Sequence, residues 1–155
     1  MFNEREGVEM NVLFVCTGNT CRRPMAEAIL QAKQLPGINV QSVGIYTSDG
    51  LPVSKHAQTL IQQSQYEVRG YSQLLQPEHI EWANLILTMT RNHVDRIHQR
   101  FPEAIHKTMT LAQYAGRGDQ EIADPYGGTF EDYQETFKQL HQLIDQIQQR
   151  LGDEG

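Results

Sequence analysis

The sequence predicts an α/β fold in which helices cover both faces of a parallel sheet. Short apolar segments alternate with helix-forming segments along the chain, and clusters of turn residues separate them. The chain has 155 residues, which suits one domain with a single buried core. The first apolar segment passes through a polar loop into a helix. Because ligands of such folds bind at the carboxyl ends of strands, this loop is the expected site.

The first three elements are a strand over residues 11–15, a loop over 16–23 and a helix over 24–35. The strand is short and almost wholly apolar, as a buried strand would be. Pro24 suits the first position of a helix, because it has no N–H to lose and its φ is preset. The residues after Pro24 are good helix formers. The loop therefore joins a strand to the N-terminus of a helix.

The remaining elements follow from the same kinds of pattern. Turn residues separate them, and an apolar stripe at helical spacing indicates that the last helix packs on the core. A single domain is predicted over residues 11–151, with a loose tail over 1–10 and a polar tail over 152–155. We expect strands over 38–44, 85–89 and 108–111, and helices from Ser54, over 77–83, from Thr90 or Asn92 to Phe101, and after Thr129.

The first loop has the composition of a phosphate cradle. Successive backbone N–H groups in a curled loop create a concavity of positive potential, to which the helix N-terminus adds. Arg22 can bind two phosphate oxygens at once through its planar fork of donors. The same field lowers the pKa of Cys16 from ~8.5 toward ~4–7, which makes it a nucleophilic thiolate. The predicted phosphate-binding residues are Thr17, Gly18, Asn19, Thr20, Cys21 and Arg22.

A plainer interpretation of the same spacing is a buried cysteine at a strand end and an unrelated surface arginine. Short patterns of this kind are common, so the spacing alone decides little. The strand before the loop, Gly18 within it and Pro24 after it favour the phosphate site.

A second segment, residues 124–128, supplies an acid. In-line displacement by a thiolate needs a proton donor on the opposite side of the phosphorus atom. Asp124 suits this role because Pro125 biases it to an extended backbone, and the two glycines that follow let the chain pass close to a substrate. Asp124 would protonate the leaving group and then accept a proton from the hydrolytic water. Tyr126 either lines the pocket wall or anchors the loop.

The segment CTGNTCRRPMAE at 16–27 resembles the phosphate-binding loop of the low-molecular-weight protein tyrosine phosphatases, and DPYGG at 124–128 resembles their general-acid loop. The resemblance extends from about residue 11 to about residue 151. It implies a three-layer αβα fold with a four-stranded parallel sheet, a phosphocysteine intermediate and phosphorylated protein substrates. It also implies that Asn19 holds the loop open with help from hydroxyl groups on neighbouring segments, for which Ser42 is the candidate.

Thr20 bears on which phosphate is hydrolysed. Tyrosine-directed members of the family commonly have a larger apolar residue at this position. Threonine here, with two glycines after the Asp-Pro-aromatic segment, is similar to the bacterial protein-arginine phosphatases of the same family. A hydroxyl group can bind a guanidinium N–H, whereas the alternative is that Thr20 supplies only its backbone to the loop. The sequence favours phosphoarginine, and phosphotyrosine is the alternative.

Arg23 departs from the family pattern, which has serine or threonine directly after the loop arginine. In the family that hydroxyl group stabilises the thiolate as it leaves phosphocysteine. Arginine has donors but a long stem and no hydroxyl group. If Arg23 points outward, hydrolysis of phosphocysteine slows, and we expect a burst followed by slow turnover that Arg23→Ser abolishes.

Composition and motifs exclude several other functions. The 13 Lys and Arg against 19 Asp and Glu give a net charge of −6, so no basic face for nucleic acid or an anionic membrane is expected. Gly-x-Gly-x-x-Gly and Gly-Lys-Thr patterns are absent, which disfavours nucleotide binding. An arsenate reductase of this fold would need a cysteine pair beyond Cys21. The histidines lack metal-ligand spacing, since His93 and His98 fall on different helix faces, and we expect no cofactor.

Cysteine usage and hydropathy predict a cytoplasmic protein, which we also expect to be a monomer. Two cysteines five residues apart do not make a secreted disulfide framework. Cys21 either packs in the core or forms a reversible disulfide with Cys16 that protects the nucleophile from over-oxidation. Neither a membrane-length apolar run nor a signal peptide is evident. A phosphate-binding module without activity remains an alternative, which the joint presence of Cys16, Arg22 and Asp124 disfavours.

Overall fold

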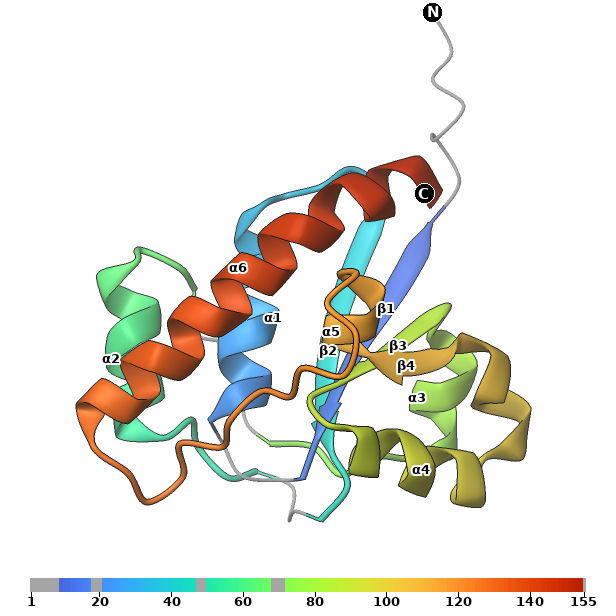
Figure 1. Ribbon diagram of the computed structural model, residues 1–155, viewed down its shortest axis with the longest axis horizontal. Helices are drawn as coiled ribbons and strands as arrows, with labels where there is room; N and C mark the ends of the chain where they lie inside the picture. The colour runs from blue at the N-terminus through green and yellow to red at the C-terminus, as the bar shows by residue number, and fades with distance from the viewer. Residues whose placement is uncertain (1–8, 18–20, 47–49, 68–71, 155) are drawn as a thin grey trace, which may run out of the picture.

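The computed structural model, which describes residues 9–17, 21–46, 50–67 and 72–154, contains a parallel sheet between two layers of helices (Figure 1). The sheet has four strands in the order β2-β1-β3-β4. This confirms the predicted fold class. The strands are β1 (Met10–Cys16), β2 (Ile38–Gly44), β3 (Leu85–Thr88) and β4 (Thr108–Thr110).

Helices on the two faces of the sheet enclose two separate hydrophobic clusters (Figure 1). Side chains of β1 alternate between them, because successive residues of a strand point to opposite faces. Val12, Phe14 and Cys16 belong to one cluster, whereas Leu13 and Val15 belong to the other. The first cluster packs under α1 (Arg22–Ala32), α2 (Lys55–Gln63), α5 (Leu111–Tyr114) and α6 (Phe130–Glu154). The second packs under α3 (Pro77–Trp82), α4 (Arg91–Arg100) and the 3₁₀ helix η1 (Pro102–Lys107).

Helix α1 begins earlier than the sequence predicts, which matters for the site. It starts at Arg22 rather than at Pro24, so two arginines lie in its first turn. Proline is tolerated there because the first four N–H groups of a helix have no partner within it. The helix ends at Ala32 and not at Leu35, since Gln34 has a positive φ of 48°. The short elements η1 and α5 were not predicted, because four to six residues give little periodic signal.

The carboxyl ends of β1 and β3 meet at one edge of the sheet, and a later segment crosses this edge. The Met89 N–H donates to the Val15 carbonyl group, and the Ile122 N–H donates to the Met89 carbonyl group. The segment that contains Asp124 is therefore anchored beside the end of β1. Among the described residues, no helix combines the length and apolarity that crossing a membrane requires.

Candidate active site

Cys16 is the last residue of β1, and its position is set by the sheet. It pairs in register with Gly44 of β2, and its carbonyl group accepts a hydrogen bond from the Ile45 N–H at 3.0 Å. Cys16 is a thiol and not half of a disulfide, and its side chain is fully buried. Three residues that the sequence predicts to bind phosphate, Gly18, Asn19 and Thr20, lie outside the described residues.

Arg22 is the residue that joins this strand end to the Asp124 segment. Only 3% of its side chain is exposed. Its Nη1 donates to the Ile122 carbonyl group at 2.9 Å, and its Nη2 lies 3.5 Å from Asp124 Oδ2. The side chain of Asp124 is 40% exposed, so this ion pair has a buried cation and a half-exposed carboxylate. Two of the three predicted catalytic side chains therefore lie together.

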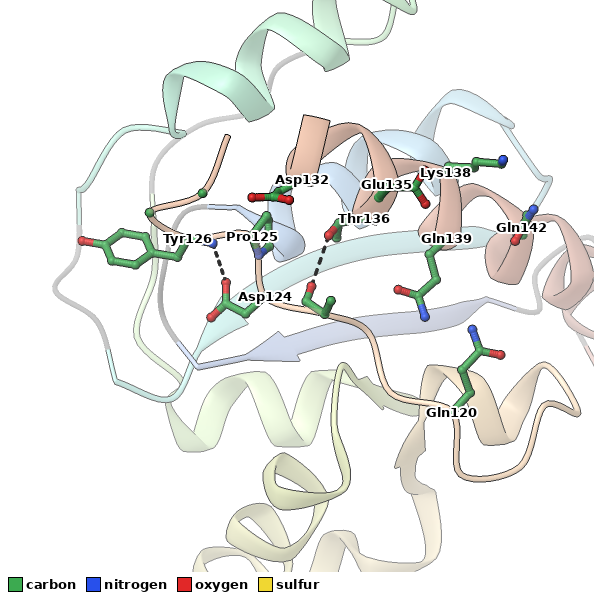
Figure 2. Close-up of a pocket in the computed structure, with 13 residues that line it drawn as sticks. Gln120, Asp124, Pro125, Tyr126, Asp132, Glu135, Thr136, Lys138, Gln139 and Gln142 are labelled. Atoms are coloured by element: carbon green, nitrogen blue, oxygen red, sulfur yellow. Dashed lines mark hydrogen bonds between the residues drawn. The ribbon is translucent and has the colours of Figure 1, made fainter. Parts of the chain in front are cut away.

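The Asp124 segment forms a tight turn. The second carboxylate oxygen of Asp124, Oδ1, accepts the Tyr126 N–H at 3.1 Å (Figure 2). Gly127 has a φ of +78°, which glycine adopts without strain. A side chain at Gly128 would collide with Asp132 and with the Pro125 carbonyl group. The glycine pair thus serves the fold of the turn, in addition to the closeness to substrate that the sequence predicts.

An open pocket of about 420 Å³ lies at this edge of the sheet. It brings together residues that follow β1, β3 and the segment after α5. Its described lining contains three of the predicted site residues, Thr17, Arg22 and Asp124. It also contains six that the sequence analysis did not assign to the site: Thr90, Asn92, His93, Glu121, Ile122 and Ala123.

His93 is the most informative of these additional residues. It is buried, its Nδ1 accepts the Thr90 N–H at 3.3 Å, and its Nε2 lies 2.8 Å from Thr17 Oγ1. Burial, together with the positive charge of Arg22, lowers the pKa of His93 to about 4, although the carboxylate of Asp124 opposes this shift. The imidazole is therefore neutral at pH 7, and its hydrogen-bond pattern assigns the proton to Nε2, which donates to Thr17. The Thr90-x-x-His93 spacing resembles a capping box, and this signal could have placed His93 beside the site.

A larger groove, of about 710 Å³, lies on the other side of the Asp124 segment (Figure 2). It runs along the N-terminal half of α6 and is lined by polar side chains such as Glu135, Lys138 and Gln139. Thr17 and Arg22 line the smaller pocket and are not among the described lining residues of this groove, so the smaller pocket is the candidate phosphate site. Cys16 is not among the described lining residues of either pocket. Tyr126 is 72% exposed, and its ring points away from α6 (Figure 2). It is among the lining residues of the larger groove and not among the described lining residues of the smaller pocket.

Cys21 lies in the core directly before α1. Its sulfur is 3.1 Å from the Tyr133 hydroxyl oxygen. Burial raises the pKa of Cys21, and burial and the bond to Cys21 raise the pKa of Tyr133 to about 12. Both groups therefore keep their protons at neutral pH. Cys21 packs as one of the two alternatives predicts, and the disulfide with Cys16 stays a prediction.

Arg23 does not point outward, so the orientation on which the predicted handicap depends is wrong. Only 3% of its side chain is exposed, and its Nη1 donates to Ser42 Oγ at 3.2 Å. Ser42 in turn donates to Glu27 Oε1 at 2.6 Å. The described side-chain contacts of Ser42 are thus with α1, whereas its predicted partner Asn19 lies outside the described residues. A single sequence could not reveal this orientation, because it depends on β2 lying beside α1.

Comparison with known proteins places this site in a family. Residues 11–155 match the family described as "Low molecular weight phosphotyrosine protein phosphatase". The chain belongs to this family. This phosphatase is 46% identical over 143 residues to a protein-arginine-phosphatase of Geobacillus stearothermophilus, covering 92% of this chain and 97% of the relative. It is 36% identical over 138 residues to the low molecular weight protein-tyrosine-phosphatase PtpB of Staphylococcus epidermidis, covering 89% and 96%.

Solved structures agree with this placement. The phosphatase superposes on a YwlE arginine phosphatase from Geobacillus stearothermophilus with a TM-score of 0.91 at 46% identity, covering 94% of each chain. It also superposes on a low molecular weight protein tyrosine phosphatase from T. tengcongensis with a TM-score of 0.86 at 33% identity, covering 92% of this chain and 99% of that one. The predicted resemblance is confirmed over nearly the whole chain.

Proposed function

We propose that this phosphatase hydrolyses phosphoarginine in proteins through a phosphocysteine intermediate on Cys16. The observation that supports this most is the meeting of Arg22 and Asp124 on one pocket beside the end of β1. A fork of donors, a carboxyl group and a strand-end cysteine are the three groups that phosphoryl transfer to a thiolate requires. They come from distant parts of the chain, and an inactive phosphate-binding module would not need all three.

In the first step, the Cys16 thiolate attacks phosphorus and a sulfur–phosphorus bond forms. The bond from phosphorus to the guanidino nitrogen breaks, and the carboxyl proton of Asp124 passes to that nitrogen. Arg22 binds the phosphoryl oxygens, whose charge it stabilises. The hydrogen bond from the Arg22 side chain to the Ile122 carbonyl group supports this role, because it limits the positions that the guanidinium can take.

In the second step, a water molecule attacks the phosphorus of phosphocysteine while the Asp124 carboxylate accepts its proton. The sulfur–phosphorus bond breaks, its electron pair returns to sulfur, and inorganic phosphate leaves. Asp124 is suited to both steps because its side chain is partly exposed and its turn is held by the Tyr126 N–H.

The charge of the pocket supports phosphoarginine as the substrate. Two carboxylates, Glu121 and Asp124, are among its described lining residues, and a substrate guanidinium is a cation. No tyrosine, phenylalanine or tryptophan is among the same described residues, so a phosphotyrosine ring would find no aromatic partner there. His93 is neutral and adds no opposing charge. Hydrolysis of phosphotyrosine is the second candidate, because PtpB relatives have that name.

Turnover of matched peptides tests the proposal. One peptide contains phosphoarginine and its twin contains phosphotyrosine, and released phosphate is measured for the wild type, Cys16→Ser and Thr20→Ile. We expect the wild type to prefer phosphoarginine, Cys16→Ser to be inactive, and Thr20→Ile to shift the preference toward phosphotyrosine. Preference for phosphotyrosine in every variant would contradict the choice of substrate. Equal rates for the wild type and Cys16→Ser would leave only a phosphate-binding module.

Phosphorylated proteins are the partners that this function requires. The cytoplasmic location and the monomeric state that the sequence predicts remain predictions. Size-exclusion chromatography with light scattering would measure the oligomeric state directly.

A further inference from the structure

Arg23 is a buried cation whose described partners use only part of its donor capacity. A guanidinium has five N–H donors and stays protonated in proteins. One of them reaches Ser42, whereas Nε and Nη2 have no hydrogen-bond partner among the described residues. Buried charges are costly unless they are paired, so a positive charge at this position needs an explanation.

The sheet register places this cation on the same face as the Cys16 thiol. Ser42, which holds Arg23, is opposite Phe14 in the pairing of β2 with β1, and Gly44 is opposite Cys16. Paired residues of parallel strands point to the same face, and so do residues two apart on one strand. Ser42 and Cys16 therefore face the same layer, which is the layer of α1. Arg23, in the first turn of that helix, reaches this layer through its hydrogen bond to Ser42.

The groups around the end of β1 favour a negative charge on Cys16. The described titratable and charged groups there are Arg22, Arg23 and Glu27 from α1, Cys21 before it, His93 from α4 and Asp124. Arg22 has Asp124 as its counter-ion, and His93 is neutral. Burial lowers the pKa of Arg23, and the charge of Cys16, then that of Glu27, acts against this shift. The Cys16 thiolate is thus a counter-charge for Arg23, as Glu27 is.

We propose that the Arg23 guanidinium, held by Ser42 on the face of the sheet to which the Cys16 side chain points, stabilises the thiolate of Cys16. This inference rests on the proposed function only for its consequence in catalysis. In the hydrolysis step the electron pair of the sulfur–phosphorus bond returns to Cys16, and the positive charge of Arg23 stabilises the thiolate that forms. Arg23 thereby replaces the hydroxyl group that the family has at this position. It is a positioning residue, because it acts through Cys16 and not on the substrate.

The pKa of the Cys16 thiol tests this inference without any need for turnover. Iodoacetamide alkylates the thiolate, and mass spectrometry of the Cys16 peptide separates its reaction from that of Cys21. The alkylation rate is measured against pH for the wild type and for Arg23→Met, which keeps the apolar stem and removes the charge. We expect the midpoint of the profile to rise by about 1–3 pH units in Arg23→Met, because a nearby opposite charge shifts a pKa by that amount. Arg23→Lys, which keeps the charge, should recover most of the shift.

Glu27→Gln is the matched control, since Glu27 is the carboxylate at the other end of the same chain of hydrogen bonds. Removal of its negative charge leaves more of the Arg23 charge for Cys16, so the midpoint should fall. A disturbance of packing alone would move both variants in the same direction, which would overturn the inference, as would an unchanged midpoint in Arg23→Met. If Arg23→Met does not fold, an unchanged or raised midpoint in Glu27→Gln is sufficient to overturn it.

Pre-steady-state kinetics with an aryl phosphate then separate the two steps, because the burst of phenol reports formation of phosphocysteine and the steady rate reports its hydrolysis. We expect Arg23→Met to keep a burst of released phenol but to show slower steady turnover than the wild type. Slower formation of phosphocysteine with unchanged hydrolysis would contradict the role assigned here. The wild type could hydrolyse no phosphorylated peptide while Arg23→Met still raises the midpoint of Cys16 alkylation. That result would overturn the proposed function and leave the inference about Arg23 standing.

Discussion

Arg22 and Arg23 are neighbours in the first turn of α1 and are equally buried, yet they belong to two different regions of the molecule. Arg22 lines the proposed phosphate pocket, where the Ile122 carbonyl group and Asp124 hold it. Arg23 is not among the described lining residues of that pocket, and its partner is Ser42 of β2. The reason is helical geometry, because 3.6 residues per turn send consecutive side chains about 100° apart.

The two arginines share residue type and burial, so these properties do not distinguish their roles. The groups that each side chain contacts do. The carboxylate beside Arg22 is half exposed and borders the pocket. The carboxylate near Arg23 is reached through a serine and does not line the pocket in its described part. Arg22 is thus suited to bind the phosphoryl group of a substrate that enters from solvent. Arg23 is suited to stabilise the Cys16 thiolate, which is part of the protein.

Removal of the two carboxylates should have the most unequal effects. We expect Asp124→Asn to lower kcat by about 10²- to 10⁴-fold on a substrate with a poor leaving group, because general acid catalysis contributes that much. Glu27→Gln keeps the hydrogen bond from Ser42 and should change kcat far less. Steady-state kinetics on a series of aryl phosphates measures this. Equal losses of kcat in Asp124→Asn and Glu27→Gln would contradict the different roles assigned to the surroundings of Arg22 and Arg23.

Lysine at the two arginine positions should separate them next. Arg22→Lys keeps the charge but loses the planar fork, and we expect kcat/KM to fall by about 10²- to 10³-fold, the cost of one preorganised donor at a reacting oxyanion. Arg23→Lys keeps the positive charge that we propose acts on Cys16, so kcat/KM should fall by less than about tenfold. The reverse order of losses would show that Arg23, and not Arg22, is the phosphate-binding residue.

His93, which lines the pocket, should make the stability of the folded protein depend on pH in the acid range. Its pKa is about 4 in the folded protein, below the ordinary value of about 6.5 that it takes when unfolded. The unfolded chain therefore binds more protons between these two values, and the native state loses stability as the pH falls through this window. Above the window both states are neutral and the stability is constant. The loss is on the order of 3 kcal/mol once the pH is below both values.

Urea unfolding of the wild type and His93→Gln at several pH values measures this contribution. Glutamine can still donate to Thr17 but does not titrate. We expect the free energies of unfolding of the two proteins to diverge as the pH falls from about 6.5 to about 4. Parallel curves would mean that another group accounts for the acid sensitivity, and that His93 is accessible to protons in the folded state.

Local signals were sufficient for the parts of this molecule whose structure is decided locally. The apolar run before Cys16 and the proline after Arg23 predict the strand, the loop and the helix, because a buried strand and a helix N-terminus each have strong preferences of their own. Asp124 was chosen on other grounds, because Asp-Pro alone is an ordinary turn dipeptide. The Cys16 loop and the resemblance of residues 124–128 to the general-acid loop of the family pointed to it.

The rest depends on contacts between distant segments. Nothing near Arg23 in the sequence indicates that Ser42 would hold it inward. His93 reaches the site because α4 follows β3, whose end lies beside the end of β1. Burial among these segments also lowers the pKa of His93 to about 4, below its ordinary value of about 6.5. Such side chains are assigned by the sheet order, which a single sequence does not specify residue by residue.

Substitution of Glu121 should have the smallest effect, and it tests most selectively whether the carboxylates of the pocket favour phosphoarginine. Glu121 lines the pocket beside Asp124, and its Oε1 accepts the Arg91 N–H at 3.0 Å. Glu121→Gln preserves the shape of the side chain and removes one negative charge from the path of a substrate guanidinium. We expect kcat/KM for a phosphoarginine peptide to fall by about two- to fivefold, the value of an exposed ion pair, and to fall less at high salt. The twin phosphotyrosine peptide should be unaffected, so a change in the ratio of the two rates isolates the charge. A similar loss on both peptides would mean that Glu121 only supports the Arg91 end of α4, and the carboxylates of the pocket would then no longer favour phosphoarginine.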